Sequence, residues 1–441
     1  MIIVASIVLN YVVGFSITGL RGRKISACIL VGGIASNLFA LAYFKYFNFF
    51  MANVAYVLQR GYSAEEIILP LAISFFTFQQ IAFLVDTYRD KGRFPDIVSY
   101  SFFVSFFPQL IAGPITRHHE LLPQIQQALA DKINKENIAV GLSIFTVGLF
   151  KKVVIADRIS SFVDPIYESS KTAGSVQFWE GWTATLGYYF QIYFDFSAYS
   201  DMAIGLGLIF GIRLPQNFNS PYKSRSIIEF WRCWHMTLSR FLRDYLYIPL
   251  GGSRAGDFKY YRNLGVVMVL GGLWHGAAWG FILWGAVHAA LLIMNHMWRR
   301  FVKNSPVFFP SGFLAGPSWI ITTCCVAFAW VLFRAESISA ASEIYRAIAG
   351  INGLGSLAEH SEIFALITIL WFWVLTMPNT IEFFRKALVR SDSGIDYTTK
   401  KLAAIPVVWS PTTAWAIFFA LLFFWSAINV GEVSEFIYFQ F

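Results

Sequence analysis

His275 is a titratable residue inside a stretch, Leu264 to Trp298, that contains no Lys, Arg, Asp or Glu. It stands in the phrase Gly-Gly-Leu-Trp-His-Gly-Ala-Ala-Trp, residues 271–279. An imidazole in hydrocarbon needs hydrogen-bond partners or a watery cavity, so an ionisable group at membrane depth is a candidate functional residue. The chemistry it would supply is general-base catalysis. The alternative is a structural histidine that is bonded to a neighbouring helix.

A second histidine, His235, lies in an aromatic and basic segment, residues 230–245. On a continuous helix the apolar side chains of this segment form one stripe, and Arg232, Arg240 and Arg243 form an arc beside it. This pattern predicts an amphipathic helix at the membrane interface, with the histidine between stripe and arc. The arginines either face lipid head groups or bind the phosphates of a nucleotide-like donor, because guanidinium groups bind phosphate bidentately. We expect the two histidines to share one site.

The composition is that of an integral membrane protein. Of 441 residues, 56% are hydrophobic, 18% aromatic and only 14% charged, which a soluble domain of this size would not show. Apolar stretches of about 17–25 residues predict membrane spans, and here they predict about ten to twelve. The expected fold is therefore all-α and polytopic, a single domain over residues 1–441 with its core at about 98–298. The net charge of +8 fits loops that face anionic membrane lipid, and nucleic acid is not implied.

Several segments depart from simple spans. Residues 27–57 and 264–298 exceed one span; the second would form about 52 Å of helix against a hydrocarbon core of about 30 Å, so it must bend, tilt or break. Residues 98–115 are apolar but contain two prolines and a glycine, which predicts a bent or re-entrant element. Basic residues at 21–24 are expected on the cytoplasmic side.

Two carboxylates, Asp195 and Asp201, lie in the largely apolar segment 179–212 and need partners or water. Neighbouring Tyr and Ser hydroxyls would make them structural, and a paired acid/base site is the alternative. Glycines recur every fourth residue over the range Gly272–Gly280. This spacing predicts a smooth helix face that admits a second helix or a thin ligand.

The sequence contains no motif of a soluble enzyme. It has no Gly-x-Ser-x-Gly elbow, P-loop, dinucleotide-binding turn or Cys/His zinc pattern, so no metal is expected. The four cysteines have neither metal-ligand nor disulfide spacing and are expected to be buried thiols. A transporter would predict inverted repeated halves, which are not evident.

Six segments together carry a family resemblance, and they extend over most of the chain. They are similar to motifs of the membrane-bound O-acyltransferase (MBOAT) family, in particular its bacterial AlgI-like branch of alginate O-acetylation proteins. The six segments are Phe107–Ile115, Phe194–Gly205, Leu214–Tyr222, Phe230–Ser239, Arg243–Arg254 and Gly271–Ala277.

The resemblance implies a ring of helices around a thinned, tunnelled centre in the bacterial cytoplasmic (inner) membrane. In that family the histidine of the Leu-Trp-His-Gly phrase is catalytic, which corresponds to His275, and His235 lies toward the donor side. Acetyl-CoA would be the acyl donor, bound by the arginines beside His235. A periplasmic partner acetyltransferase related to SGNH hydrolases would complete O-acetylation of an exopolysaccharide such as alginate or cellulose. Peptidoglycan O-acetylation and D-alanyl transfer to teichoic acid remain alternatives.

The resemblance agrees with the chemistry of the residues. An apolar setting favours the neutral form of an imidazole. A neutral His275 could then accept the proton of an incoming hydroxyl as that hydroxyl attacks the thioester carbonyl. General-base catalysis of this kind contributes roughly 10²–10⁴ in rate.

The C-terminal segment 435–441 is strongly aromatic and includes Tyr438. One interpretation is an aromatic belt at the membrane interface. The segment also resembles the end of a small membrane peptide that accompanies the D-alanyl transferase branch, where a terminal tyrosine is a proposed acyl carrier. We therefore hypothesise that His275 activates Tyr438 to accept acetyl from coenzyme A. A phenyl ester is a reactive carrier, because a phenol with a pKa near 10 is a better leaving group than an alcohol.

Overall fold

The computed structural model describes residues 2–90, 94–111, 113–130, 133–254, 256–304, 315–388, 397 and 404–432. Within these ranges the chain is helical and contains no strand, which confirms the expected all-α fold. The chain forms two compact units. The first comprises Met1–Ile138 and Leu206–Pro215, and the second comprises Ala139–Gly205, Gln216–Asp392 and Tyr397–Phe441.

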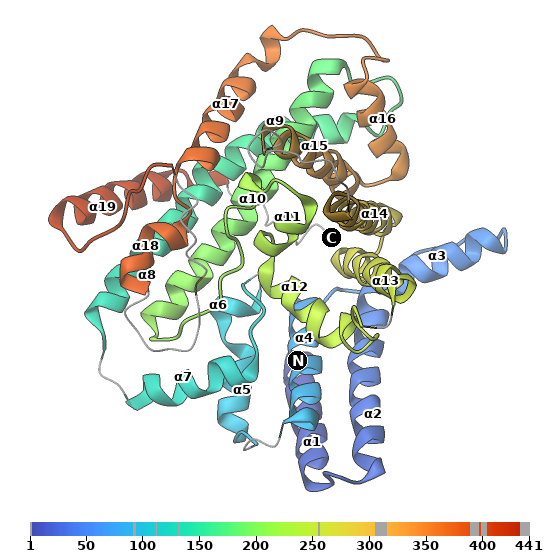
Figure 1. Cartoon of the computed structure of the whole chain (residues 1–441), viewed down its shortest axis with the longest axis vertical. Coiled ribbons are helices and arrows are strands. Elements are labelled where there is room, and N and C mark those ends of the chain that lie inside the picture. Colours follow the sequence, from blue (N-terminus) through green and yellow to red (C-terminus); the bar gives the residue numbers. More distant parts are fainter. Residues whose placement is uncertain are drawn as a thin grey trace. The chain divides into compact units, whose positions relative to one another are not determined.

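The first unit is built around three helices, α1, α2 and α4, that pack together (Figure 1). At the contact between α1 and α2, the amides of Asn10 and Asn37 exchange two hydrogen bonds of 3.2 and 2.6 Å. Polar side chains between membrane helices are satisfied by such mutual contacts. The helices of this unit are α1 (Ile2–Gly19), α2 (Lys24–Leu41), α3 (Phe47–Val57), α4 (Ile73–Arg89), α5 (Ile97–Ser105), α6 (Phe107–Leu110) and α7 (His118–Ala130).

The bent element expected at 98–115 is present. Helix α5 ends at Ser105, Phe106 adopts an extended conformation, and the four-residue helix α6 follows with Pro108 in its first turn. A proline is tolerated there because the first turn of a helix has no intrahelical partner for its N–H.

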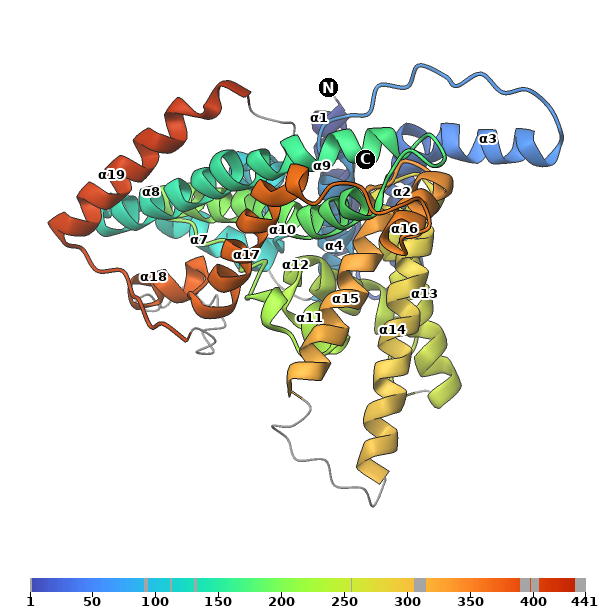
Figure 2. The same ribbon diagram turned by 90° about the horizontal axis from the view of Figure 1, so that it is seen from above.

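The second unit contains most of the helical chain, and the candidate site lies in it. Figures 1 and 2 show α13 and α14 side by side, with α15 next to α14. The helices are α8 (Lys135–Phe150), α9 (Asp157–Ser169), α10 (Phe178–Ile209), α11 (Ile227–Cys233), α12 (Met236–Leu242), α13 (Asp257–His275), α14 (Trp279–Asn304), α15 (Ala315–Arg334), α16 (Ile338–Ile348), α17 (Ser361–Thr376), α18 (Thr380–Leu388) and α19 (Thr413–Ile428).

Six helical stretches within the described ranges are long and apolar enough to cross a membrane. Three of them join consecutive helices, and the longest two have 34 and 35 residues. The chain is therefore a multi-pass membrane protein. The six stretches are Ile2–Gly19, Lys24–Val57, Lys135–Ser169, Trp279–Val302, Ala315–Arg334 and Ala358–Leu388.

Helices α8 and α10 approach each other at backbone distance because glycines occupy the contact. A Cβ added to Gly148 would lie 2.7 Å from the carbonyl oxygen of Ala198, and one added to Gly205 would lie 2.5 Å from that of Gly141. These contacts leave no room for any larger residue at either glycine. The close packing holds the polar end of α8 against the middle of α10.

The apolar stretch 264–298 breaks into two helices, as its length requires. Helix α13 ends at His275, and α14 begins at Trp279 and packs back along α13. Glycines again allow the contact, since a Cβ on Gly272 would lie 2.3 Å from the carbonyl oxygen of Phe281. The hairpin places His275 at the end of a helix, next to a tight three-residue connection.

Candidate active site

His235 occupies the break between α11 and α12. Its backbone has φ +43° and ψ 53°, in the left-handed region that non-glycine residues rarely adopt. The continuous amphipathic helix expected over 230–245 is therefore wrong: the chain turns at His235, and residues such as Trp234 and Leu238 are buried in protein. Backbone strain of this kind, of order 1–3 kcal/mol, persists where surrounding contacts enforce it.

Asn217 supplies much of the enforcing contact. Its Oδ1 atom lies 3.0 Å from Nδ1 of His235 and accepts a hydrogen bond of 3.0 Å from the Thr237 hydroxyl. Its backbone carbonyl accepts a hydrogen bond of 2.9 Å from the Met236 amide. Its Nδ2 atom donates to the hydroxyl of Ser200 on α10, at 3.2 Å. The loop before α11 thus ties the break in the chain to α10.

The sequence reasoning missed Asn217. The Pro-Gln-Asn-Phe-Asn segment, residues 215–219, contributed only to the family resemblance, because a lone asparagine in a loop has no pattern that marks it as a histidine partner. Only the tertiary contact reveals its role.

His275, the last residue of α13, lies in an aromatic pocket. Its ring lies 5.3 Å from the ring of Trp284 on α14 and 5.1 Å from the ring of Phe333 on α15, measured between centroids. It also contacts the ring of Trp274 at 5.0 Å. The adjacent Gly276 is required, because a Cβ there would lie 2.0 Å from the Phe281 ring. The phrase around His275 therefore builds both a tight turn and an aromatic enclosure.

The structure brings His235 and His275 together. Their ring centroids are 6.4 Å apart, and the residues are 1% and 4% exposed. The ring of Phe196, on α10, packs edge-on against His235 at 4.8 Å. Burial lowers the pKa of His235 to about 3, so its imidazole is neutral at any physiological pH. Its Nε2 atom is buried and has no hydrogen-bond partner among the described residues.

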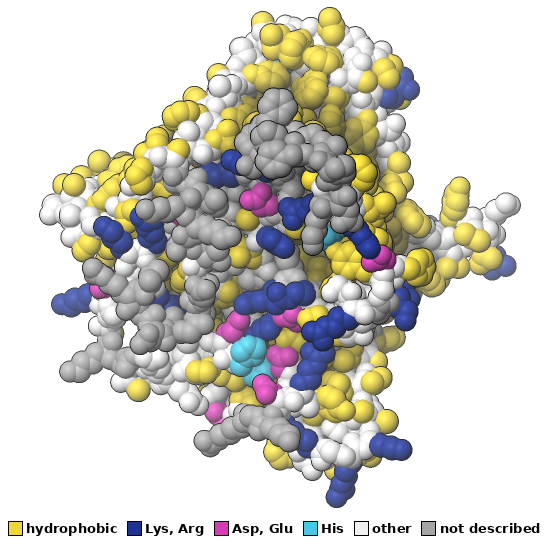
Figure 3. Space-filling model, in the orientation of Figure 1, with side chains coloured by type: hydrophobic (Ala, Val, Ile, Leu, Met, Phe, Trp, Pro, Cys, Tyr) yellow, Lys and Arg dark blue, Asp and Glu magenta, His cyan; other side chains and the backbone are white. Residues whose placement is uncertain are grey.

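The three arginines beside His235 do not form one helix face, because the break at His235 separates Arg232 on α11 from the other two. Arg243 is exposed, and both its Nε and an Nη atom contact the carboxylate of Asp244, at 2.6 and 3.1 Å. Arg240 is half-buried and Arg232 is exposed. Figure 3 shows basic side chains gathered over α12. Positive charge is therefore present near the site.

The carboxylates on α10 have partners that differ from those expected. Asp195 lies 2.8 Å from the ammonium group of Lys152, and Asp201 lies 2.6 Å from that of Lys151. The local hydroxyls were expected to satisfy them, but the main partners are two lysines at the end of α8. Because each carboxylate is held by a cation, the two do not form a shared acid/base pair. Adjacent lysines at the end of an apolar run were the signal in the sequence.

The residues that remain to be described are His288, the four cysteines and the C-terminal tail. His288 is fully buried and accepts a hydrogen bond of 3.2 Å from Trp231, so it links α14 to α11. The hairpin of α13 and α14 places the ring of Trp284 in contact with the rings of both His275 and His288, at 5.3 and 4.8 Å. All four cysteines are free thiols, but the expected burial is wrong, because Cys28 is exposed and the other three are half-buried. Tyr438 and the tail 435–441 lie outside the described residues.

Comparison with known proteins places this geometry in a family. Residues 34–335 match the model of the membrane-bound O-acyltransferase family. The chain is 42% identical to the peptidoglycan O-acetyltransferase of Helicobacter pylori, over 80% of this chain and 70% of that protein. It is 35% identical to the probable alginate O-acetylase AlgI of Azotobacter vinelandii, over 98% and 89%. It is 26% identical to the teichoic acid D-alanyltransferase of Bacillus subtilis, over 64% and 72%.

The matched range contains His235, His275, Asn217 and the aromatic enclosure, and the relatives that align over most of the chain are named as acyl-transferring enzymes. The chain belongs to the membrane-bound O-acyltransferase family and is a membrane-embedded enzyme that transfers an acyl group to an oxygen nucleophile.

Proposed function

We propose that this protein transfers acetyl groups from cytoplasmic acetyl-CoA across the bacterial inner membrane for O-acetylation of an extracellular polysaccharide. The observation that carries the proposal is the pair of buried histidines, with ring centroids 6.4 Å apart, at the meeting point of α11, α12 and α13. Relatives named as a peptidoglycan O-acetyltransferase and as alginate O-acetylases support acetyl as the group and polysaccharide as the acceptor.

His275 is the proposed general base. A hydroxyl attacks the thioester carbonyl of acetyl-CoA while the imidazole accepts the hydroxyl proton. The tetrahedral intermediate then expels the thiolate, which recovers the proton, so the imidazole returns to its neutral form. The position of His275 at the C-terminal end of α13 suits this role, because the partial negative charge of a helix C-terminus stabilises the transient imidazolium.

His235 is proposed to hold the donor side of the reaction. Its Nδ1 is engaged by Asn217, so Nε2 is the nitrogen available to a reacting group. The exposed arginines Arg232 and Arg243 would contact the phosphates of coenzyme A, with Arg240 beside them. The side chain of Arg243 is 61% exposed and that of Asp244 is 18% exposed. Ion pairs at a protein surface contribute about 0–1 kcal/mol, so a phosphate can displace the carboxylate at little cost.

The acceptor of the first transfer is proposed to be Tyr438, with a periplasmic SGNH-hydrolase-like acetyltransferase collecting acetyl from the resulting ester. The support is the chemistry of a phenol as acyl carrier and the 26% identity to a teichoic acid D-alanyltransferase. Tyr438→Phe removes the nucleophile and keeps the ring. Full polymer acetylation by this variant would show that Tyr438 is not the acyl carrier.

The proposed polymer is an exopolysaccharide of the alginate type, and peptidoglycan is the second candidate. The alginate O-acetylase relative aligns over 98% of this chain, which favours the first. The 42% identity to a peptidoglycan O-acetyltransferase favours the second. Ester-linked acetate measured separately in exopolysaccharide and in peptidoglycan, from cells with and without the gene, distinguishes them.

The central experiment compares His275→Ala with His360→Ala, a histidine at the start of α17. Acetyl transfer from radiolabelled acetyl-CoA and the unfolding temperature in detergent are measured on the same preparations. We expect His275→Ala to lose transfer by roughly 10²–10⁴ while remaining folded, because it removes only the base. Retained transfer excludes His275 as the base, and loss of folding assigns it a structural role.

A further inference from the structure

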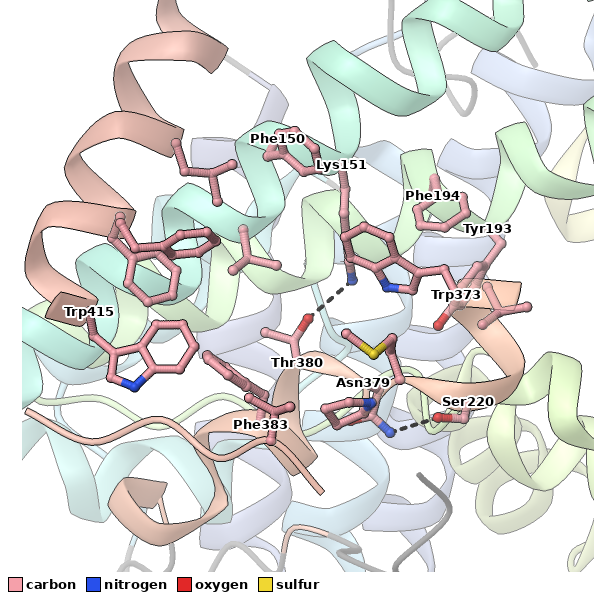
Figure 4. Close-up of a pocket in the computed structure, with 18 of the residues that line it drawn as sticks. Phe150, Lys151, Tyr193, Phe194, Ser220, Trp373, Asn379, Thr380, Phe383 and Trp415 are labelled. Atoms are coloured by element: carbon pink, nitrogen blue, oxygen red, sulfur yellow. Dashed lines mark hydrogen bonds between the residues drawn. The ribbon is translucent and has the colours of Figure 1, made fainter. Parts of the chain in front are cut away.

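The helices α8, α10, α17, α18 and α19 enclose a cavity of about 390 Å³ that plays no part in the chemistry proposed above (Figure 4). Its wall is mostly apolar, and aromatic rings supply much of it, including those of Phe150, Phe383 and Trp415. The volume lies within the range of about 300–1,000 Å³ that small-molecule sites occupy. The cavity is therefore large enough to hold a ligand.

The charged group at the cavity, the ammonium group of Lys151, already has hydrogen-bond partners. The ammonium group of Lys151 bonds to Asp201 at 2.6 Å, Thr380 at 3.1 Å and Ser197 at 3.3 Å, which uses its three donors. Figure 4 shows the Lys151–Thr380 contact in the cavity wall. Because a buried water needs two to four polar partners, such a wall offers water little.

Asn379 is satisfied in the same way. Its amide nitrogen donates to Asn219 at 3.2 Å and to the Ser220 hydroxyl at 2.9 Å, and the second of these bonds is drawn in Figure 4. The occupant best matched to this wall is apolar, since it gains contacts with the rings and displaces no hydrogen bond.

The rim of the cavity opens toward an apolar medium. Trp373 on α17 and Phe418 and Trp425 on α19 line the cavity and are 42%, 49% and 50% exposed. Helix α17 belongs to a stretch able to cross a membrane, and α19 is a shorter apolar helix. Large exposed apolar side chains on such helices face lipid.

The volume of the cavity selects among apolar occupants. An α-helix with side chains is about 10 Å across and rises 5.4 Å per turn. One turn of such a cylinder already fills roughly the whole cavity, so a partner helix could not insert more than that. An extended hydrocarbon chain is thin and can follow the gap between α17, α19 and α8.

We propose that this cavity binds one acyl chain of a membrane phospholipid. The chain would enter between Trp373 and Trp425 and pack against Phe150, with Leu422 of α19 at its side. Its role would be to fill the cavity that α17 and α18 leave beside α10. This site is independent of the acetyl transfer proposed above.

Native mass spectrometry of the full-length protein tests the proposal. After removal of excess lipid, the protein is mixed with phosphatidylglycerol in mild detergent and the lipid-bound fraction is measured. Leu422→Trp fills the cavity, and Leu421→Trp makes the same change at a neighbouring residue of α19 that is 64% exposed and does not line the cavity. We expect lipid affinity to fall at least about tenfold in the first variant and to be unchanged in the second.

Two further measurements test the proposal if the Leu422→Trp variant does not fold. Val374→Phe fills the cavity from α17 and should also lower the affinity for lipid. Phosphatidylglycerol with brominated acyl chains should quench the fluorescence of Trp415, seen as the difference between wild type and Trp415→Phe. Equal lipid binding in all variants, absence of this quenching, or recovery of a bound polypeptide in place of lipid would overturn the proposal.

Discussion

The Nδ1 atom of His235 lies 3.0 Å from Oδ1 of Asn217, and this contact fixes the protonation of the ring. The backbone N–H of Thr237 also points at this Asn217 atom, at 3.4 Å, and a backbone N–H can only donate. The atom is therefore the amide oxygen, so the neutral imidazole carries its proton on Nδ1. The lone pair is on Nε2, the nitrogen left open by the described residues.

Substitutions of Asn217 should distinguish a role in positioning His235 from a role in folding. Asn217→Leu removes the acceptor and should lower acetyl transfer by about 10- to 100-fold, as the loss of a ligand-orienting partner does at other sites. Asn217→Asp keeps an acceptor oxygen at the same place and should recover part of the activity. Transfer rates with acetyl-CoA and the pH profile of the rate are measured for both variants.

Ser200→Ala is the control for Asn217, because it removes the hydroxyl on the far side of the same amide. It should leave the shape of the pH profile unchanged. If Asn217→Leu alters only the unfolding temperature and the rate keeps its wild-type pH dependence, Asn217 supports the fold and does not set the histidine tautomer.

The sequence singled out the two histidines because each stands in an environment that can be recognised from the sequence alone. His275 interrupts a long uncharged run, and His235 lies among aromatic and basic residues. Their contact depends on two chain breaks. The break after His275 was required by length, whereas the one at His235 was not, because helical periodicity continues through it.

The partners of the buried polar groups were harder to predict. Asn217, Lys151 and Lys152 act through contacts with residues 18 to 50 positions away or through ion pairs between helices. Helix periodicity carries no information on which residue of another helix lies opposite. The glycine contacts that bring α8 to α10 are equally a property of two helices together.

The acid stability of the protein should depend on His235, which is buried, and on His118, which is half-buried. Burial lowers the pKa of His235 to about 3, and burial followed by repulsion from His119 lowers the pKa of His118 to about 4. Both values lie below the unfolded value of about 6.5, so the unfolded state binds more protons between these limits. The stability that the neutral rings contribute is complete above pH 6.5 and is lost as the pH falls toward 3.

His235→Gln should therefore flatten the pH dependence of unfolding. One fewer proton taken up on unfolding corresponds to about 1.4 kcal/mol per pH unit between pH 6 and pH 4. Unfolding of the detergent-solubilised protein is followed at several pH values, with His118→Gln as an independent second case. A slope that stays at the wild-type value in His235→Gln would show that this ring is protonated in the folded protein.

The affinity for acetyl-CoA at the basic surface near His235 should depend on the salt concentration. If Arg232 and Arg243 contact the phosphates of coenzyme A, the double variant to Gln should bind acetyl-CoA more weakly than wild type. The loss should be greatest at low ionic strength, because salt screens exposed charges and already weakens the wild-type contacts. Titration calorimetry at 0.05 M and about 0.5 M salt measures both affinities.

Arg158→Gln serves as the matched control for charge, since Arg158 is also exposed and paired with a carboxylate, that of Glu362. It should leave the affinity for acetyl-CoA and its salt dependence unchanged. An unaltered affinity in the double variant would assign Arg232 and Arg243 to the lipid interface.

The ion pair between Lys151 and Asp201 is the strongest test of what holds the second unit together. The two side chains are 13% and 9% exposed, and their charged atoms lie 2.6 Å apart between α8 and α10. Asp201→Leu leaves the ammonium group buried without its counter-charge, which should cost about 3–5 kcal/mol. The double change Lys151→Met with Asp201→Leu removes both charges and should recover most of that loss, since a buried pair and a well-packed apolar pair differ little.

The exposed pair of Arg158 and Glu362 provides the comparison, and Arg158→Met should change stability by at most about 1 kcal/mol. Unfolding temperatures of the three variants and of the wild type in one detergent measure these differences. A double variant as unstable as Asp201→Leu alone would mean that Asp201 acts mainly through its hydrogen bond from Thr380 and not through the lysine.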